Sequence, residues 1–163
     1  MAQLGEKGRA RVQPYLQSKD EIEVVVAYRA LRHSQPDRML EYAKSLAQSS
    51  FASVRREVAV SLKSIPYANT RDILAHLIAG FDGRNRFYLE ALGVAFHGKE
   101  KQVYDELVAP LFPNPGKWGS KAKNLAWRLY TPDAIGDLDR CIRAQKPPVD
   151  EFRLLAMAFA SFR

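Results

Sequence analysis

The chain has 163 residues, of which 47% are hydrophobic and 26% charged, and it carries a net charge of +7. This length suits one ordinary domain. No stretch approaches the roughly 20 apolar residues of a membrane-spanning helix, and the first residues carry no export signature. We therefore expect a soluble basic domain with no membrane insertion. The single cysteine, Cys141, excludes an internal disulfide and a multi-cysteine metal site.

The residues after position 19 predict a series of helices, because their apolar residues recur at helical spacing. Ser18 and Glu21 have the spacing of a capping box at the first start, and Thr131 with Pro132 marks a later one. The predicted first helices cover residues 20–33, 54–65, 86–97, 120–130 and 150–162. The predicted second helices cover residues 37–48, 69–83, 99–111 and 133–144. Residues 1–19 are expected to be an N-terminal extension or a partial helix.

These helices recur as pairs at intervals of about thirty residues, the range of solenoid repeats. Equivalent first-helix positions, spaced by 31, 30, 37 and 30 residues, are Leu31, Leu62, Leu92, Leu129 and Phe159. A helix pair that cannot bury its apolar stripe alone can bury it against a similar neighbour. The pattern predicts an all-α fold, a right-handed α-α superhelix of about four and a half helical pairs, with residues 20–163 forming one domain.

Two sets of residues carry a resemblance to a known family. The segment Val54-Arg55-Arg56-Glu57-Val58-Ala59 resembles the first helix of a HEAT or HEAT-like (PBS-lyase-type) repeat, which has a Val-Arg pair followed by Ala and Leu positions. Residues 82–93 and 118–130 are similar to the HEAT-repeat region of membrane-bound dehydrogenases of planctomycete type. The resemblance implies a connecting or docking module that is part of a larger protein.

Those large dehydrogenases also carry a propeller-like domain and a haem-attachment motif. This sequence has no Cys-x-x-Cys-His motif and too few residues for a propeller. Their redox activity therefore does not transfer to this chain.

No catalytic pattern is evident in the sequence. His33, His76 and His97 fall on three different repeats without the convergent spacing of metal ligands. Cys141 lies on the apolar side of its predicted helix, which favours a buried inert thiol. We therefore predict no enzyme activity, no cofactor and no metal ion.

Other prominent residues also have structural explanations. Arg55 is expected to bridge to an acidic residue of an adjoining repeat, with Asp37 or Asp82 as acceptors. Four aromatic residues are expected in the core: Phe87, Tyr88, Trp118 and Trp127.

Two surfaces are candidates for binding. Solenoid modules commonly bind through the groove lined by their second helices. The exposed positions expected there, our candidate partner surface, are Arg38, Glu41, Arg71, His76, Lys101, Asp105, Asp137 and Arg140. Positive charge is concentrated in the fourth repeat, in a candidate basic patch of Lys117, Lys121, Lys123, Arg128, Arg140, Arg143 and Lys146.

The function predicted from these features is a non-catalytic HEAT-repeat scaffold or protein-protein interaction module with a protein partner. The alternative is nucleic-acid binding, because some alkyl-base DNA glycosylases resemble this chain in being basic HEAT-like solenoids. Such proteins need a concave cleft with an acidic residue and stacking aromatics. The basic patch favours this alternative, although basic residues on solenoid surfaces also occur simply as a solvated face.

Overall fold

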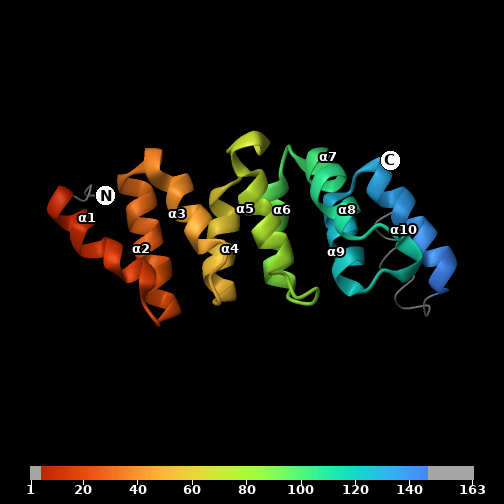
Figure 1. The fold of residues 1–163 in the computed structure, drawn as a ribbon, viewed down its shortest axis with the longest axis horizontal. Helices are drawn as coiled ribbons and strands as arrows, with labels where there is room; N and C mark the ends of the chain where they lie inside the picture. Colours follow the sequence, from red (N-terminus) through yellow and green to blue (C-terminus); the bar gives the residue numbers. More distant parts are fainter. Residues whose placement is uncertain (1–4, 147–163) are drawn as a thin grey trace. The chain divides into compact units, whose positions relative to one another are not determined.

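The computed structural model describes residues 5–146 (Figure 1). All regular secondary structure in this range is helical, and it contains no β-strand. The predicted all-α class is confirmed for this part of the chain. Packing divides the chain after Gly80 into two compact units, residues 1–80 and 81–163. The predicted last helix, 150–162, and its core residue Phe159 lie outside the described residues.

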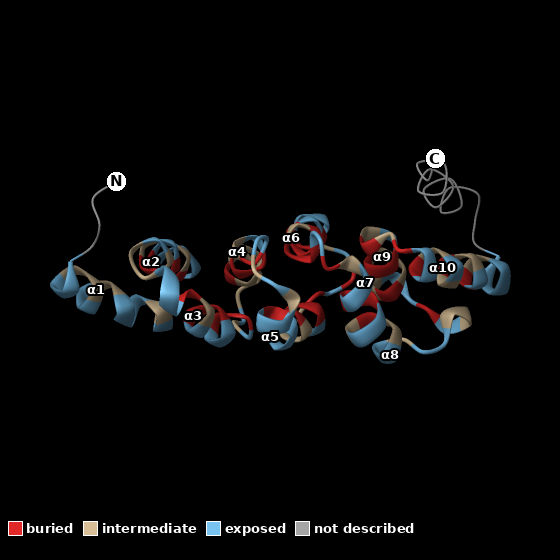
Figure 2. Ribbon diagram, turned by 90° about the horizontal axis from the view of Figure 1, so that it is seen from above, coloured by how far each residue is buried: buried red, intermediate tan, exposed pale blue. Residues whose placement is uncertain are grey.

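The first unit begins with a short helix, α1 (Glu6–Val12), and a 3₁₀ turn (Gln13–Gln17) that packs on α2. Two helix pairs follow. They are α2 (Glu21–Ser34) with α3 (Met39–Leu46), and α4 (Ala52–Ser61) with α5 (Tyr67–Ala79). Within the unit α2 lies beside α4 and α3 lies beside α5, and the buried residues face the space between these two layers (Figure 2).

The second unit also consists of helices joined by short connections. It contains α6 (Arg86–Phe96), α7 (Glu100–Val103), a π-helical turn (Tyr104–Val108) and α8 (Ala109–Leu111). A 3₁₀ turn (Pro115–Lys117) then leads to α9 (Ser120–Leu129) and α10 (Pro132–Gln145). Helix α9 packs against α6 and α10, and the 3₁₀ turn packs against α10.

The leucines predicted at equivalent positions are core residues in both units. Leu31 and Leu62 in the first unit, and Leu92 and Leu129 in the second, are all at most 2% exposed. Burying such a side chain stabilises the fold by about 1.5 to 3 kcal/mol. The thirty-residue spacing in the sequence therefore marks the inward face of successive helices.

Helix starts follow local capping chemistry, and two of them differ from the sequence prediction. Asp20, not Ser18, caps α2, because its side chain accepts a hydrogen bond from the Ile22 amide. Helix α5 begins at Tyr67, ahead of the predicted start, and Thr70 is buried inside its first turns. The predicted cap at Thr131 is confirmed, since its hydroxyl accepts from the Ala134 amide.

The predicted helix 99–111 is present but widened at its centre. Proline at position 110 has no amide hydrogen, and its ring crowds the carbonyl group of Glu106 four residues earlier. The helix accommodates this residue by opening into the π-helical turn over Tyr104–Val108. Tyr104 and Val108 are buried by this turn.

Candidate functional site

Four residues of the candidate partner surface lie in the first unit, on or next to α3 and α5. Arg38 donates two hydrogen bonds to the Glu41 carboxylate, at 2.7 and 2.9 Å. Arg71 forms an ion pair with its neighbour Asp72 at 3.3 Å. His76 Nε2 lies 3.5 Å from Gln48 Nε2.

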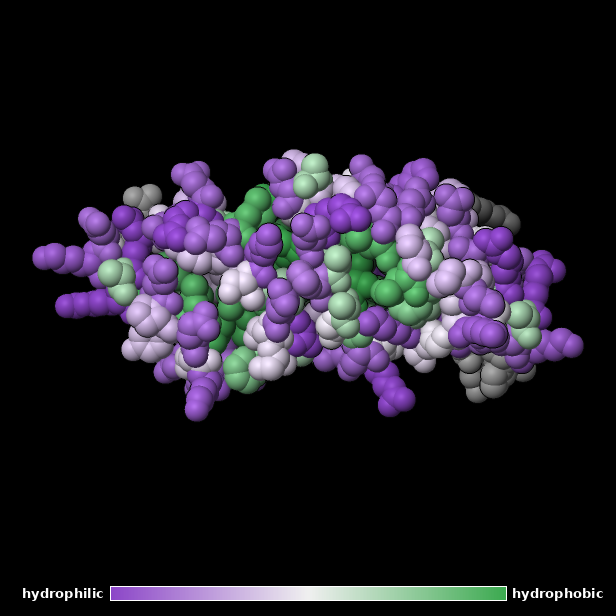
Figure 3. Space-filling view, in the orientation of Figure 1, coloured by the Kyte–Doolittle hydropathy of each residue, from purple (hydrophilic) through white to green (hydrophobic). Residues whose placement is uncertain are grey.

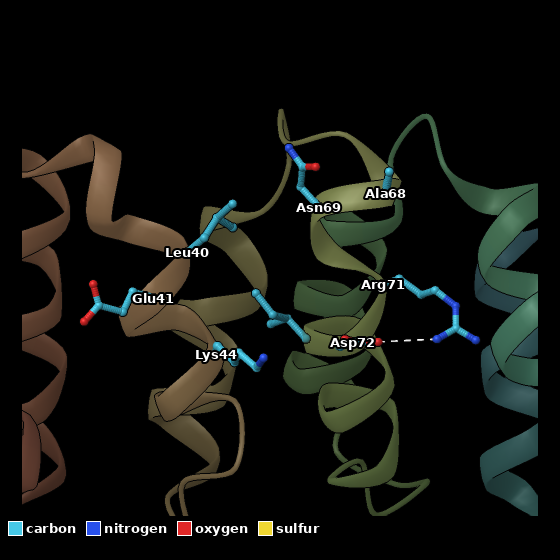
Figure 4. A pocket seen from close by; sticks show the side chains of 8 residues that line it. Leu40, Glu41, Lys44, Ala68, Asn69, Arg71 and Asp72 are labelled. Carbon is cyan, nitrogen blue, oxygen red and sulfur yellow. Dashed lines mark hydrogen bonds and ion pairs between the residues drawn. The ribbon is translucent and has the colours of Figure 1, made fainter.

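Glu41 and Arg71 also line a groove between α3 and α5, which we call the α3–α5 groove. It has a volume of about 470 Å³ and is lined by Leu40, Glu41, Lys44, Ala68, Asn69, Arg71, Asp72 and Ile73. Leu40 and Lys44 point from α3 towards α5, whereas Glu41 and Arg71 point outwards at its two edges (Figure 4). Apolar side chains are visible among polar ones over this region (Figure 3).

The centre of the groove combines an apolar floor with one unpaired lysine. Leu40 and the buried Ile73 provide the floor, and Ala68 adds a small exposed side chain at one end. Lys44 is exposed and has no ion pair or hydrogen bond within the described part of the chain. The α3–α5 groove can therefore accept apolar side chains beside a carboxylate.

Ion pairs connect α2 to α4 in the first unit. Glu57 is nearly buried, accepts a hydrogen bond from Arg29 at 2.6 Å and forms an ion pair with Arg32 at 3.2 Å. The sequence prediction assigned the bridge between repeats to Arg55. Arg55 donates to the carbonyl groups of Ser49, Ser50 and Gly80, joining the loop before α4 to the end of α5.

The other four residues of the candidate partner surface come together in the second unit. Lys101 pairs with Asp105 at 2.6 Å and with Asp133 at 3.6 Å. Asp137 accepts hydrogen bonds from Tyr104 and Arg140. These contacts join α7 and the π-helical turn to α10, so the residues act first as a link between helices.

Replacing Tyr104 by phenylalanine tests this link. The variant loses the hydrogen bond to the Asp137 carboxylate, and we expect the free energy of unfolding to fall by about 1 to 3 kcal/mol in urea titrations. Burial and the Asp137 carboxylate raise the pKa of the Tyr104 hydroxyl above its ordinary value of 10.0. The stability tied to this proton is complete below pH 10 and is lost at higher pH, so the variant should lose less stability than the wild type in that range.

The exposed Tyr15 provides the control for this measurement. Tyr15→Phe should leave stability and its alkaline dependence unchanged. Equal effects of the two substitutions would contradict a specific role for the Tyr104–Asp137 contact.

The residues of the candidate basic patch are spread over the 3₁₀ turn, α9 and α10. The three arginines are each paired with a carboxylate: Arg128 with Glu90 at 3.4 Å, Arg143 with Asp139 at 2.7 Å, and Arg140 with Asp137. Lys121 is half-buried, and this burial lowers the pKa of its ammonium group. Lys117 and Lys146 are exposed. The patch therefore carries less unpaired charge than its composition indicates.

The four aromatic residues predicted in the core divide into two pairs. Tyr88 and Trp118 are buried, as predicted. Phe87 on α6 is 74% exposed and Trp127 on α9 is 38% exposed, so the prediction is wrong for these two. Their helices bury the adjacent residues Tyr88 and Ala126 instead, which turns Phe87 and Trp127 to the surface.

The other candidate residues take structural positions. Cys141 is buried on α10, as predicted, and His33 and His97 are exposed near the ends of α2 and α6. Within residues 5–146 no group of three or more His, Cys, Asp or Glu side chains is arranged to hold a metal ion. No helix in the same range has the length and apolar character needed to cross a bilayer.

Comparison with known proteins gives no relative on which to base a function. The chain matches no family profile, no curated protein and no solved structure.

Proposed function

We propose that the chain is a HEAT-like α-solenoid module that binds another protein and has no catalytic role. The thirty-residue recurrence of helix pairs supports the solenoid, as does the burial of the equivalent leucines within each unit. The packing of α2 beside α4 and of α3 beside α5 supports it further. In stacked repeats, each helix packs against the equivalent helix of the next repeat. The resemblance of residues 54–59, 82–93 and 118–130 to the HEAT regions of large dehydrogenases is consistent with a docking role.

The α3–α5 groove is the observation that carries the proposal. Two second helices form its walls, it joins an apolar floor to charged edges, and its Lys44 is available for a partner carboxylate. Three of its eight lining residues are apolar and five are polar or charged, and such a mixture of apolar and polar groups is found in protein interfaces. The groove is open along α3 and α5, which favours an extended or helical peptide over a small molecule.

Filling the groove tests the proposed function. Peptides that bind the wild-type chain would be selected from a displayed library of random sequences, and their affinities measured by fluorescence anisotropy. Ala68→Arg places a long charged side chain at the exposed end of the groove. We expect it to weaken binding of groove-selected peptides by about tenfold or more, because the new side chain occupies part of the groove. A tenfold change corresponds to about 1.4 kcal/mol of binding free energy.

The matched control is Ala79→Arg, at the opposite end of the same helix and also exposed. It adds the same side chain away from the groove and should leave the affinity unchanged. A selection that yields no peptide, or yields only peptides that tolerate Ala68→Arg, would count against the groove.

Nucleic-acid binding is the competing proposal, and the exposure of Trp127 on the basic helix α9 favours it. Two observations favour the protein partner. Arg128, Arg140 and Arg143 are already paired with carboxylates, and a phosphate would have to displace those partners. Of the second-helix aromatics, Tyr42 and Tyr104 are buried and cannot stack on a base.

A further inference from the structure

Two exposed aromatic side chains project from a pair of packed helices in the second unit. Phe87 lies on α6 and Trp127 on α9, and the two helices are in contact. Large apolar side chains exposed on neighbouring helices are common in binding surfaces and cost solvation free energy when they are left uncovered. Phe87 and Trp127 have no core role that would explain their size.

An ion pair also links these two helices. Arg128 on α9 reaches Glu90 on α6 at 3.4 Å, and its guanidinium group lies directly over Gly93. A methyl group at position 93 would come within 1.9 to 2.1 Å of that guanidinium group, so glycine is needed for this approach. Nearer the helix starts, the Asn124 side chain donates to the Gly83 carbonyl at 2.9 Å.

Helix geometry places the aromatic residues beside this ion pair. Phe87 precedes Glu90 by three residues and so shares its side of α6. Trp127 is the neighbour of Arg128 on α9 and projects to solvent next to it. We call the surface formed by Phe87, Glu90, Trp127 and Arg128 the α6–α9 face. Helices α6 and α9 pack against each other, so these four residues belong to one packed pair of helices.

The surroundings of the α6–α9 face are basic. Residues 81–96 and 118–130 contain five basic and two acidic residues, a net charge of +3, and α9 has no carboxylate. Arg86 is exposed next to Phe87 and has no ion pair among the described residues. Lys123 lies one turn before Trp127 on the same side of α9. Complementary charge would therefore come from an acidic partner.

We propose that the α6–α9 face docks an acidic segment of a partner protein that carries large apolar side chains. The apolar side chains would cover Phe87 and Trp127, and the carboxylates would lie towards the basic edge of the face at Arg86. This inference rests on the proposed role in protein binding, but it uses a surface separate from the α3–α5 groove and assigns the chemistry of the partner.

A polynucleotide fits this face less well than such a segment. The half-exposed carboxylate of Glu90 lies between the aromatic residues and would repel a phosphate backbone. A peptide can place apolar groups over the Glu90–Arg128 ion pair and its carboxylates at the basic edge. Nucleic-acid bases can stack on exposed aromatic side chains such as Phe87 and Trp127, so the test also includes single-stranded DNA.

The experiment selects random displayed peptides on the full chain carrying Ala68→Arg, in which the groove is blocked. We expect the selected peptides to be rich in Asp and Glu with Phe, Trp or Leu. Their affinity should fall by about tenfold or more in the Phe87→Ala/Trp127→Ala double variant and in Arg86→Glu/Lys123→Glu. Bound peptide should also shift the emission of Trp127 to shorter wavelength, measured against a Trp127→Phe variant.

Leu111→Ala is the matched control, because Leu111 is an exposed apolar residue elsewhere in the same unit. It should leave the affinity unchanged. The inference is overturned if the selected peptides have no acidic excess or bind the double aromatic variant as well as the wild type. It is also overturned if fluorescein-labelled oligo(dT) binds and depends on Phe87 and Trp127. These outcomes concern only peptides that bind the α6–α9 face. Peptides that bind the α3–α5 groove test the proposed function in a separate experiment.

Discussion

Replacing Trp118 by alanine is expected to lower the free energy of unfolding by about 3 to 5 kcal/mol, the usual cost of removing a buried aromatic side chain. Trp118 is only 4% exposed, and its Nε1 donates to the Phe112 carbonyl at 2.8 Å. Gln145 on α10 donates in turn to the carbonyl groups of Gly116 and Trp118. The substitution therefore opens a cavity and releases the loop between α8 and α9.

Urea denaturation followed by circular dichroism measures this effect. Trp118→Phe should cost less than alanine, because it keeps most of the apolar volume and loses the hydrogen bond to Phe112. Trp127→Ala is the matched control, since the other tryptophan is 38% exposed and its removal should cost clearly less stability than that of Trp118. Similar losses for Trp118→Ala and Trp127→Ala would show that the burial assigned to these two residues is wrong.

Much of the helical organisation could be predicted from the sequence because it depends on local chemistry. Apolar residues at helical spacing marked the inward faces, and the leucines at thirty-residue intervals are all buried in the described units. Pro132 and Thr131 identified the start of α10 correctly. The error at α2 has a local cause as well: Ser18 and Asp20 both favour a capping position, and the side chain nearer the helix makes the bond.

The contacts between helices could not be predicted in the same way. The sequence assigned Asp137 only to the candidate partner surface. Its hydrogen bond with Tyr104 depends on the widened turn that Pro110 imposes 27 residues earlier in the chain. Residue types also did not reveal that Glu57 forms ion pairs with both Arg29 and Arg32.

The sequence predicted part of the candidate surfaces correctly and part of them wrongly. Glu41 and Arg71 were predicted for a partner surface from their helix positions, and both line the α3–α5 groove. Phe87 and Trp127 were assigned to the core because large aromatics are usually buried. Phe87 comes just before the buried Tyr88, and Trp127 comes just after the buried Ala126. One position along a helix is a rotation of about 100°, which turns both aromatic side chains towards the surface.

The position of α9 beside α6, on which the α6–α9 face depends, requires a glycine outside both helices. Gly83 has φ of +82°, a conformation that side-chain-bearing residues rarely adopt. A Cβ atom added there would lie 2.9 Å from the Cα, Cβ and N atoms of Lys121, in the first turn of α9. Lys121 offers backbone atoms at this contact, so the clash cannot be relieved by turning a flexible side chain.

Gly83→Ala is therefore expected to lower the free energy of unfolding by about 2 to 5 kcal/mol, combining roughly 1 to 2 for backbone strain with roughly 1 to 3 for overpacking. Gly98→Ala is the matched control, since Gly98 has φ of +75° with no atom within 4 Å of the added Cβ. Urea denaturation of both variants separates strain from packing. In Gly83→Ala alone, α9 should shift from α6 and acrylamide should quench Trp127 more strongly. Equal losses in the two variants would mean that strain is the whole effect and that Gly83 does not set the position of α9.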